Sequence, residues 1–294
     1  MNAESNLFGQ NSISLACLGR PAKRVIASAR NACLIGITSH GLFLLVDGEE
    51  VLFLTHEPFR GPLTLNLSEP LAGSSLMQLG DPVFIQDTGI FFPQGRQSIS
   101  LVGALVWQPP GILPGALRPA ELKARISQLQ ERQPARWIMI ESNGLESCAQ
   151  ALRSGSVQAA GALKGFLGRG PGLTPQGDDF ILGLLLALNR WQKLFPTDVA
   201  VEAINQEIVW AARRQTTALS ASLIACAAEA QADERLVRAL DGLVTGTPEA
   251  EECAALFQDW GSTSGWVAFQ GMAMAFTTWS FPWQQYNNGS LPFP

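Results

Sequence analysis

The chain has 294 residues, of which 47% are hydrophobic and 15% are charged, and its formal net charge is −5 at pH 7. This composition excludes a disordered protein, and the acidic balance without a basic cluster argues against non-specific nucleic-acid binding. The first ten residues lack the basic and apolar regions of a signal peptide, and the most apolar stretches are too short to span a bilayer, so we expect a soluble cytoplasmic protein without membrane contact.

The N-terminal part of the chain has the pattern of short strands separated by glycine and proline. Leu42–Val46 and Val51–Leu54 flank Asp47-Gly48, which is a strong hairpin signal. The other candidate strands are Val25–Ser28, Leu34–Thr38, Leu63–Leu67, Val83–Ile85, Ile90–Phe92 and Ile99–Val106. This spacing predicts a β-rich barrel or sandwich domain over residues 1–115.

The periodicity changes to that of helices after a proline- and glycine-rich linker over residues 109–115. A helix is predicted from Pro119, with Leu122, Ile126 and Leu129 on one face. Two short helices follow within residues 144–167. Phe180–Trp191 is apolar on nearly every side, which predicts a central buried helix.

The remaining segments complete a predicted helical domain over residues 116–294. One or two helices are expected within residues 198–230, and Asp233 is expected to cap another. Thr247-Pro248 predicts an N-cap followed by a first-turn proline, for a helix that ends near Trp260-Gly261. Trp266–Trp279 is the last helix, and the tail after it is expected to be irregular. The predicted fold class is therefore α+β, with the strands first and the helices second.

The cysteines and histidines limit the chemistry that is available. The five cysteines form no CxxC pair, so we expect free and mostly buried thiols. The two histidines, His40 and His56, both precede the helical domain, and we interpret them as turn or strand-end residues. A histidine-rich metal site or a serine–histidine triad is therefore not available in the C-terminal half.

The segment Gly168–Asp179, with the sequence GRGPGLTPQGDD, is the most distinctive motif of the chain. Its glycines and prolines predict an irregular loop that exposes the backbone. Thr174 and Pro175 are suited to the N-cap and the first position of the buried helix. Free amides at a helix start attract anions, and Arg169 can add a charge-assisted contact to a carboxylate or phosphate.

Asp178 and Asp179 follow the loop in the first turn of an otherwise apolar helix. They could simply complement the helix dipole. Burial of a carboxylate without a partner is costly, however, so three further roles remain open. One of the two acids could accept hydrogen bonds from a ligand amide, bind a divalent cation, or hold the loop by its own backbone.

Two further segments carry small hydroxyl side chains. Thr216 and Ser220 share a helix face, and Thr217 lies beside them. Such residues either permit close helix packing or bind a ligand. The segment Gly261–Gly265, with the sequence GSTSG, is either a pair of helix caps or a second set of hydrogen-bond donors that faces the loop.

These three segments together resemble the family of the third subunit of oxamate carbamoyltransferase (AllH-like, first catalogued as a domain of unknown function). The resemblance covers about residues 165–275 and is strongest over Gly170–Asp179. Two positions depart from the family pattern, because Ser262 stands where a histidine is usual and Val267 where an acid is usual.

The resemblance implies a subunit of a carbamoyltransferase complex in purine and allantoin nitrogen catabolism, with other subunits and a small carbamoyl or phosphate compound as partners. The reaction would interconvert oxalurate and phosphate with oxamate and carbamoyl phosphate. Asp178 and Asp179 are then the candidate catalytic residues. The candidate substrate-binding residues are Arg169, Gly170, Gly172, Thr174, Thr216, Thr217, Ser220, Thr263 and Ser264.

Two alternatives stay open at this point. The first is an enzyme in which Asp178 and Asp179 bind Mg²⁺ that bridges a phosphate ligand. The second is a non-catalytic scaffold subunit, in which the apolar surplus and the eight tryptophans cover a partner interface.

Overall fold

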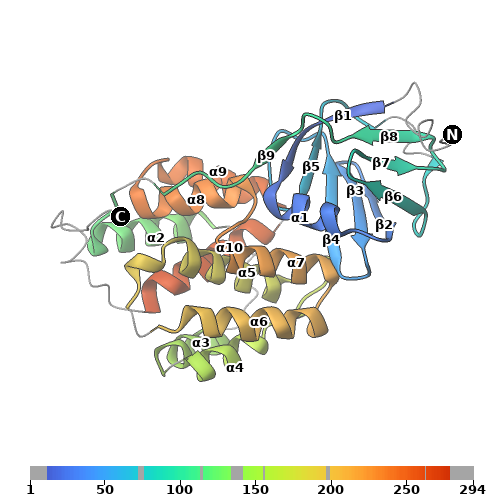
Figure 1. Cartoon of the computed structure of the whole chain (residues 1–294). Coiled ribbons are helices and arrows are strands. Elements are labelled where there is room, and N and C mark those ends of the chain that lie inside the picture. The colour runs from blue at the N-terminus through green and yellow to red at the C-terminus, as the bar shows by residue number, and fades with distance from the viewer. Residues whose placement is uncertain are drawn as a thin grey trace, which may run out of the picture. The chain divides into compact units, whose positions relative to one another are not determined.

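The computed structural model describes residues 12–71, 76–112, 115–133, 142–154, 156–196, 199–261 and 263–278. The chain forms two compact units, Met1–Pro109 and Pro110–Pro294, and each is described by itself (Figure 1). No helix among the described residues is both long enough and apolar enough to cross a membrane.

The N-terminal unit is a closed barrel of eight strands with a ninth strand at its side. The sheet order is β5-β4-β3-β2-β6-β7-β8-β1-β9, and an additional pairing between β5 and β1 closes the ring of the first eight strands. The strands are β1 Ser12–Gly19, β2 Ala32–Thr38, β3 Gly41–Val46, β4 Glu50–Thr55, β5 Thr64–Leu67, β6 Pro82–Gln86, β7 Gly89–Phe92, β8 Gln97–Ser100 and β9 Leu105–Trp107. Strand β1 pairs in parallel with β8 and β9, and β4 pairs in parallel with β5, whereas the other neighbours are antiparallel.

The hairpin predicted around Asp47-Gly48 is confirmed. Strands β3 and β4 pair in antiparallel register, and both turn residues have positive φ angles, 51° for Asp47 and 78° for Gly48. This conformation suits asparagine, aspartate and glycine, so the turn is set by its own sequence. Side chains that point inward from β3 and the neighbouring strands, such as Leu44, Leu52 and Leu65, fill the barrel and are fully buried.

The fold class predicted from the sequence is wrong as stated, because the N-terminal unit is one closed barrel that also contains a helix. Residues Val25–Ser28, predicted as a strand, belong to helix α1, Arg20–Ser28. The helix has a proline in its first turn and buries Pro21, Ala22 and Ile26, which is a helical spacing. The predicted strand Ile99–Val106 is also broken into β8 and β9, and β1 was not among the predicted strands.

The C-terminal unit has nine α-helices and one short 3₁₀ helix among its described residues. These are α2 Pro119–Arg132, α3 Ser142–Ser154, α4 Ser156–Lys164, α5 Gln176–Arg190, η4 Gln192–Leu194, α6 Val201–Gln215, α7 Ala218–Ala228, α8 Glu234–Thr245, α9 Ala250–Asp259 and α10 Ser264–Thr278. The predicted helix from Pro119 is confirmed, and its three apolar residues are buried. The cap at Asp233 is confirmed as well, since its side chain accepts from the Arg235 amide.

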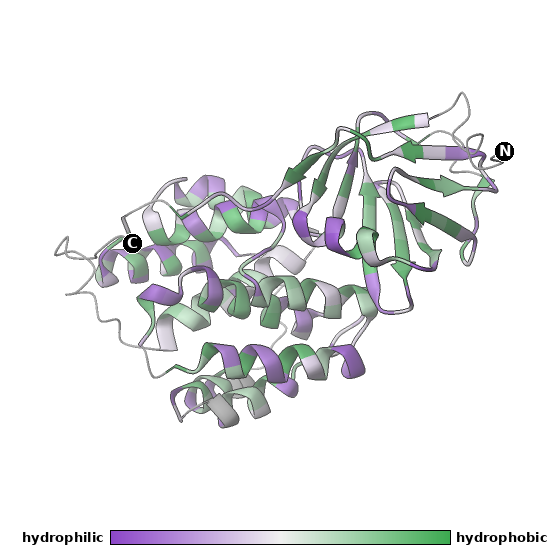
Figure 2. Ribbon diagram, in the orientation of Figure 1, coloured by the Kyte–Doolittle hydropathy of each residue, from purple (hydrophilic) through white to green (hydrophobic). Residues whose placement is uncertain are grey.

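Helix α5 is the buried centre of this unit, as the apolar run from Phe180 predicts. All of its residues from Gly177 to Leu188 are buried. Its main neighbour is α10, which is also largely apolar (Figure 2). The two helices touch backbone to backbone, because a Cβ on Gly183 would lie 1.9 Å from the Ala268 carbonyl oxygen. A Cβ on Gly271 would lie 2.0 Å from the Phe180 carbonyl oxygen.

The predicted start of α9 is wrong, and one prediction falls outside the described part. Helix α9 begins at Ala250 with Glu249 as its N-cap, and Thr247-Pro248 precedes it with a cis peptide bond. The proline therefore lies in the connection rather than in the first turn. The tail predicted to be irregular, residues 279–294, lies outside the described residues.

Candidate functional site

The glycine-rich loop runs from the end of α4 to the start of α5. Gly168, Gly170 and Gly172 have positive φ angles of 69°, 115° and 100°, which side chains rarely tolerate. At Gly168 the packing also excludes a side chain, since a Cβ would lie 2.5 Å from the Gln215 carbonyl oxygen. The loop is therefore held against the end of α6 through a close backbone contact.

The start of α5 differs from the sequence prediction. Pro175 is the N-cap and no side chain caps the helix, so neither Thr174 nor Pro175 has its predicted position. The first helical amides are already bonded, because Gly177 donates to the Arg169 carbonyl and Asp178 donates to the Pro175 carbonyl. The expected free amides at the helix start are therefore absent at these positions.

Amides without a partner lie instead in the loop itself. The N–H groups of Gly170, Gly172, Leu173 and Thr174 make no hydrogen bond within the described part of the chain. Gly170, Gly172 and Leu173 are exposed, as is the neighbouring Arg169. Exposed amides beside a guanidinium group suit an anion.

Asp178 joins the loop to the connection between α6 and α7. Its side chain is buried, one carboxylate oxygen accepts from the Gly168 amide at 2.8 Å, and the other accepts from the Thr216 hydroxyl. Both carboxylate oxygens of Asp178 thus accept hydrogen bonds from the protein, and one of these bonds holds the loop at the Gly168 amide.

Asp179 is in a different environment, although it is adjacent in sequence. Its side chain is 1% exposed, and its Oδ2 atom has no hydrogen-bond partner among the described residues. Burial raises the pKa of the Asp179 carboxyl to about 8; a hydrogen bond with the Ser264 hydroxyl lowers it, and repulsion from Asp178 raises it further. The carboxyl group is therefore mainly protonated at neutral pH.

Several of the predicted hydroxyl side chains converge on the loop. The Thr217 hydroxyl donates to the Leu173 carbonyl at 2.7 Å and accepts from the Ser220 amide at 3.1 Å, so it ties the loop to the start of α7. The Thr174 and Ser264 hydroxyl oxygens are 3.4 Å apart, which links the loop to the start of α10. Ser220 is buried, and its hydroxyl has no partner among the described residues.

The remaining residues singled out from the sequence lie along the chain at or near the start of α10. Thr263 is half-buried, and its carbonyl accepts from the Val267 amide, which gives the threonine a backbone role at the start of α10. Val267 is buried in the core, and Ser262 lies outside the described residues. No group of three histidine, cysteine, aspartate or glutamate side chains with metal-binding geometry occurs among the residues that the structure describes.

Two features of this region were not predicted from the sequence. The contact between Gly168 and Gln215 and the bond between Asp178 and Thr216 both join segments about 40 to 50 residues apart. The spacing of the motifs gave no signal for these pairs. Arg213 and Arg214 in the last turn of α6 gave only a weak signal, since they place positive charge near Thr216 in sequence.

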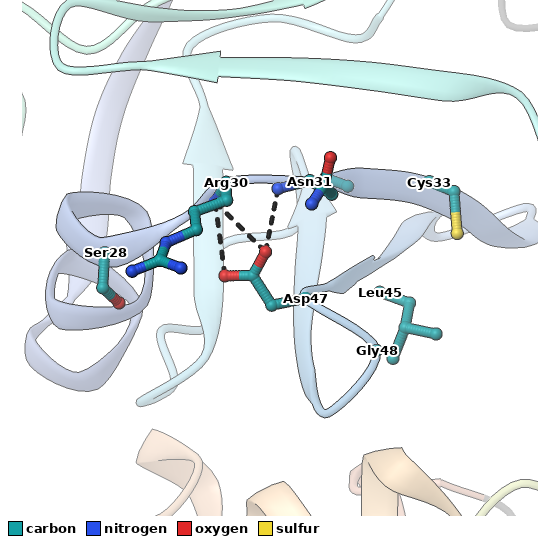
Figure 3. A pocket seen from close by; sticks show the side chains of 8 residues that line it. Ser28, Arg30, Asn31, Cys33, Leu45, Asp47 and Gly48 are labelled. Carbon is teal, nitrogen blue, oxygen red and sulfur yellow. Dashed lines mark hydrogen bonds between the residues drawn. The ribbon is translucent and has the colours of Figure 1, made fainter.

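A separate pocket in the barrel unit was also not predicted. It has a volume of about 610 Å³ and is lined by residues from the end of α1, β2 and the β3–β4 hairpin (Figure 3). The Asp47 carboxylate accepts from the backbone amides of Arg30 and Asn31, with distances of 2.8 to 3.2 Å. This carboxylate fixes the connection between α1 and β2.

The architecture thus defines a protein with a β-barrel unit and a helical unit, in which a glycine-rich loop leads into the buried central helix. Within the helical unit, residues 166–276 match the family model described as "Oxamate carbamoyltransferase subunit AllH". The resemblance drawn from the sequence motifs is confirmed over these residues, which include the loop and the starts of α5, α7 and α10. No curated protein and no solved structure matches the chain.

Proposed function

We propose that this chain is a subunit of an oxamate carbamoyltransferase-like complex and that its loop Gly168–Asp179 binds a small anionic ligand. One observation carries the proposal. The residues that match the family model include the loop, and exposed loop residues with unbonded amides are adjacent in sequence to Arg169. Because the family is one of subunits, the working enzyme would contain further chains.

The reaction that we assign to the complex converts oxalurate and phosphate into oxamate and carbamoyl phosphate. The bond between the carbamoyl carbon and the oxamate nitrogen breaks, and a phosphate oxygen bonds to that carbon. The nitrogen takes the proton that the hydrogen phosphate gives up. Oxalurate, oxamate and carbamoyl phosphate each combine a terminal CO–NH₂ group with an anionic group.

The loop has complementary groups for the anionic part of these compounds. The amides of Gly170, Gly172 and Thr174 and the guanidinium of Arg169 are the donors in this proposal. Fixed donors of this kind stabilise charge that develops on an oxygen during acyl transfer without a covalent intermediate.

The hydroxyl side chains divide into two groups. Ser220 and Ser264 are candidates for direct contact, whereas Thr216 and Thr217 position Asp178 and Leu173. The bond from Thr216 to Asp178 and the bond from Asp178 to Gly168 hold the loop at the ligand position.

Isothermal titration calorimetry with oxamate, carbamoyl phosphate and inorganic phosphate tests the proposal. We expect Arg169→Gln to lower the affinity for all three by about tenfold, which corresponds to one charge-assisted hydrogen bond. Arg132→Gln, at the exposed end of α2, is the matched control and should leave binding unchanged. If none of the three compounds binds the full chain or the chain together with its co-purifying partners, the proposed function is refuted.

A further inference from the structure

Asp179 combines burial with an oxygen atom that has no partner. The side chain is 1% exposed, and Oδ2 makes no hydrogen bond among the described residues, although Ser264 bonds to the same carboxyl group. A buried polar atom without a partner costs free energy, and such atoms are rare in folded proteins. They are tolerated where a ligand or water supplies the missing bond.

The helices packed against α5 provide no cation for this carboxyl group. Helix α10 contains no charged residue, and the only titratable side chain of α7 is Cys226. The acids of α6, Glu202 and Glu207, are exposed, and η4 adds only the exposed Lys193 at the other end of α5. Near the loop and Thr216 in sequence, Arg169, Arg213 and Arg214 are exposed, and the half-buried Lys164 is paired with Glu207.

We propose that Asp179 binds the ligand as a neutral carboxylic acid and recognises a carbamoyl or carboxamide group through two hydrogen bonds. Its O–H group donates to the ligand C=O, and its other oxygen accepts from the ligand NH₂. This inference rests on the proposed function, since it names the chemical class that the same loop site takes.

The neutral form is required by the chemistry of the ligand. A primary amide presents one donor and one acceptor side by side, and a protonated carboxyl group presents the complementary pair. An ionised carboxylate has two acceptors, so one of them would face the ligand carbonyl and repel it. Asp178 cannot take this role, because both of its oxygens already accept hydrogen bonds from the protein.

The two ends of the site then recognise the two ends of the ligand. The exposed amides and Arg169 take the anion, and Asp179, with Ser264 beside it, takes the amide. Because Oδ2 is enclosed, the loop must move for a ligand to reach it. Side-chain bonds to the loop from α7 and α10 are made by Thr217 and by Ser264, which are both small hydroxyls.

Calorimetry of the full chain with oxamate and with inorganic phosphate tests this inference. For the wild type, we expect oxamate affinity to be constant from pH 6 to pH 7.5 and to fall by about tenfold per pH unit well above pH 8. Titrations at pH 9 in buffers with different ionisation enthalpies should show the uptake of about one proton. Asp179→Leu should weaken oxamate binding by about tenfold or more between pH 6 and pH 7.5, where the wild-type carboxyl group holds its proton.

Asp179→Asn is the discriminating variant, because its amide can form the same two bonds but has no proton to lose. It should bind oxamate more tightly than Asp179→Leu does, with no alkaline loss and no proton uptake. Phosphate affinity, compared with the wild type at one pH, should not change in either variant.

The outcomes separate this inference from the proposed function. If oxamate and phosphate bind but the wild type shows neither alkaline loss nor proton uptake, the inference is overturned and the proposed function stands. The same holds if Asp179→Asn binds oxamate as weakly as Asp179→Leu does. If neither compound binds the wild type, both proposals are overturned.

Discussion

Replacement of Asp179 by asparagine is expected to remove a loss of stability that the wild-type chain undergoes as pH rises toward neutral. Burial raises the pKa of this carboxyl from its ordinary value of 3.8 to about 8 in the folded chain. Between these values the folded state holds a proton that the unfolded state releases, so the free energy of unfolding of the wild type falls as pH rises. The stability that this bound proton contributes is fully present below pH 3.8 and is lost once the pH has risen to about 8.

The magnitude follows from the width of this interval. Each pH unit is worth about 1.4 kcal/mol, so the wild type is about 4 kcal/mol less stable at pH 7 than at its acidic limit and about 5 kcal/mol less stable at pH 8, where the carboxyl group is half ionised. Asparagine has no proton to release, so the free energy of unfolding of the Asp179→Asn variant should lack this dependence on pH. The buried amide adds a constant cost or gain, which shifts the whole profile without changing the slope.

Urea unfolding at pH 5, 6, 7 and 8 measures the effect in both proteins, with the fluorescence of Trp191 and Trp266 reporting on the helical unit. The stability difference between the variant and the wild type should grow by about 1.4 kcal/mol per pH unit from pH 5 to pH 7 and by less from pH 7 to pH 8, where the folded carboxyl group begins to ionise. High salt should leave this slope nearly unchanged, because its main cause is burial rather than an exposed ion pair. Parallel profiles would refute the reasoning, since they would mean that Asp179 is ionised in the folded chain.

Four substitutions test the packing in the helical unit by the same urea assay. Gly183→Ala should cost at least 3 kcal/mol, because its Cβ would lie 1.9 Å from the Ala268 carbonyl oxygen, and an unchanged midpoint would contradict the contact. Gly161→Ala, in the open on α4, should instead stabilise the chain by about 0.5–1 kcal/mol. Thr216→Val should cost about 1–3 kcal/mol by leaving Oδ2 of Asp178 without a donor, whereas Thr216→Ser should recover most of this; equal losses would refute the hydrogen bond.

The parts of the fold that the sequence predicted are those fixed by local patterns. The β3–β4 hairpin depends on two turn residues with positive φ, and α2 depends on the spacing of Leu122, Ile126 and Leu129. Both can be recognised within a short window. The length and apolar character of α5 likewise predicted a buried central helix without any knowledge of its neighbours.

The errors in the barrel unit occur where packing within the whole unit decides the structure. Val25–Ser28 contains β-branched residues that favour a strand, but Ala22 and Ile26 are buried together on one side of a helix. Closure of the barrel depends on the pairing of β5 with β1, whose residues are about 50 positions apart. The choice between a barrel and a sandwich therefore could not be made from strand spacing alone.

The two acids at the start of α5 show the same difference between what the local sequence predicts and what tertiary contacts determine. The sequence identified Asp178 and Asp179 as important but left their roles interchangeable. The structure separates them, because one side of the first turn of α5 faces Thr216 and another faces Ser264. Adjacent residues on a helix point about 100° apart, so neighbours in sequence meet different helices.

The position of Asp179 depends in turn on the close contact between α5 and α10. Gly183 and Gly271 bring the two backbones together without side chains between them, and this contact fixes the start of α10 beside the first turn of α5. Packed backbones are stiff compared with loops, so the Ser264 hydroxyl and the Asp179 carboxyl keep their relation when the loop moves. The proposed amide-binding group therefore belongs to the rigid core, and the proposed anion-binding group belongs to the loop. A ligand that carries both groups would bridge them, which gives a physical reason for a glycine-rich loop directly before a buried helix.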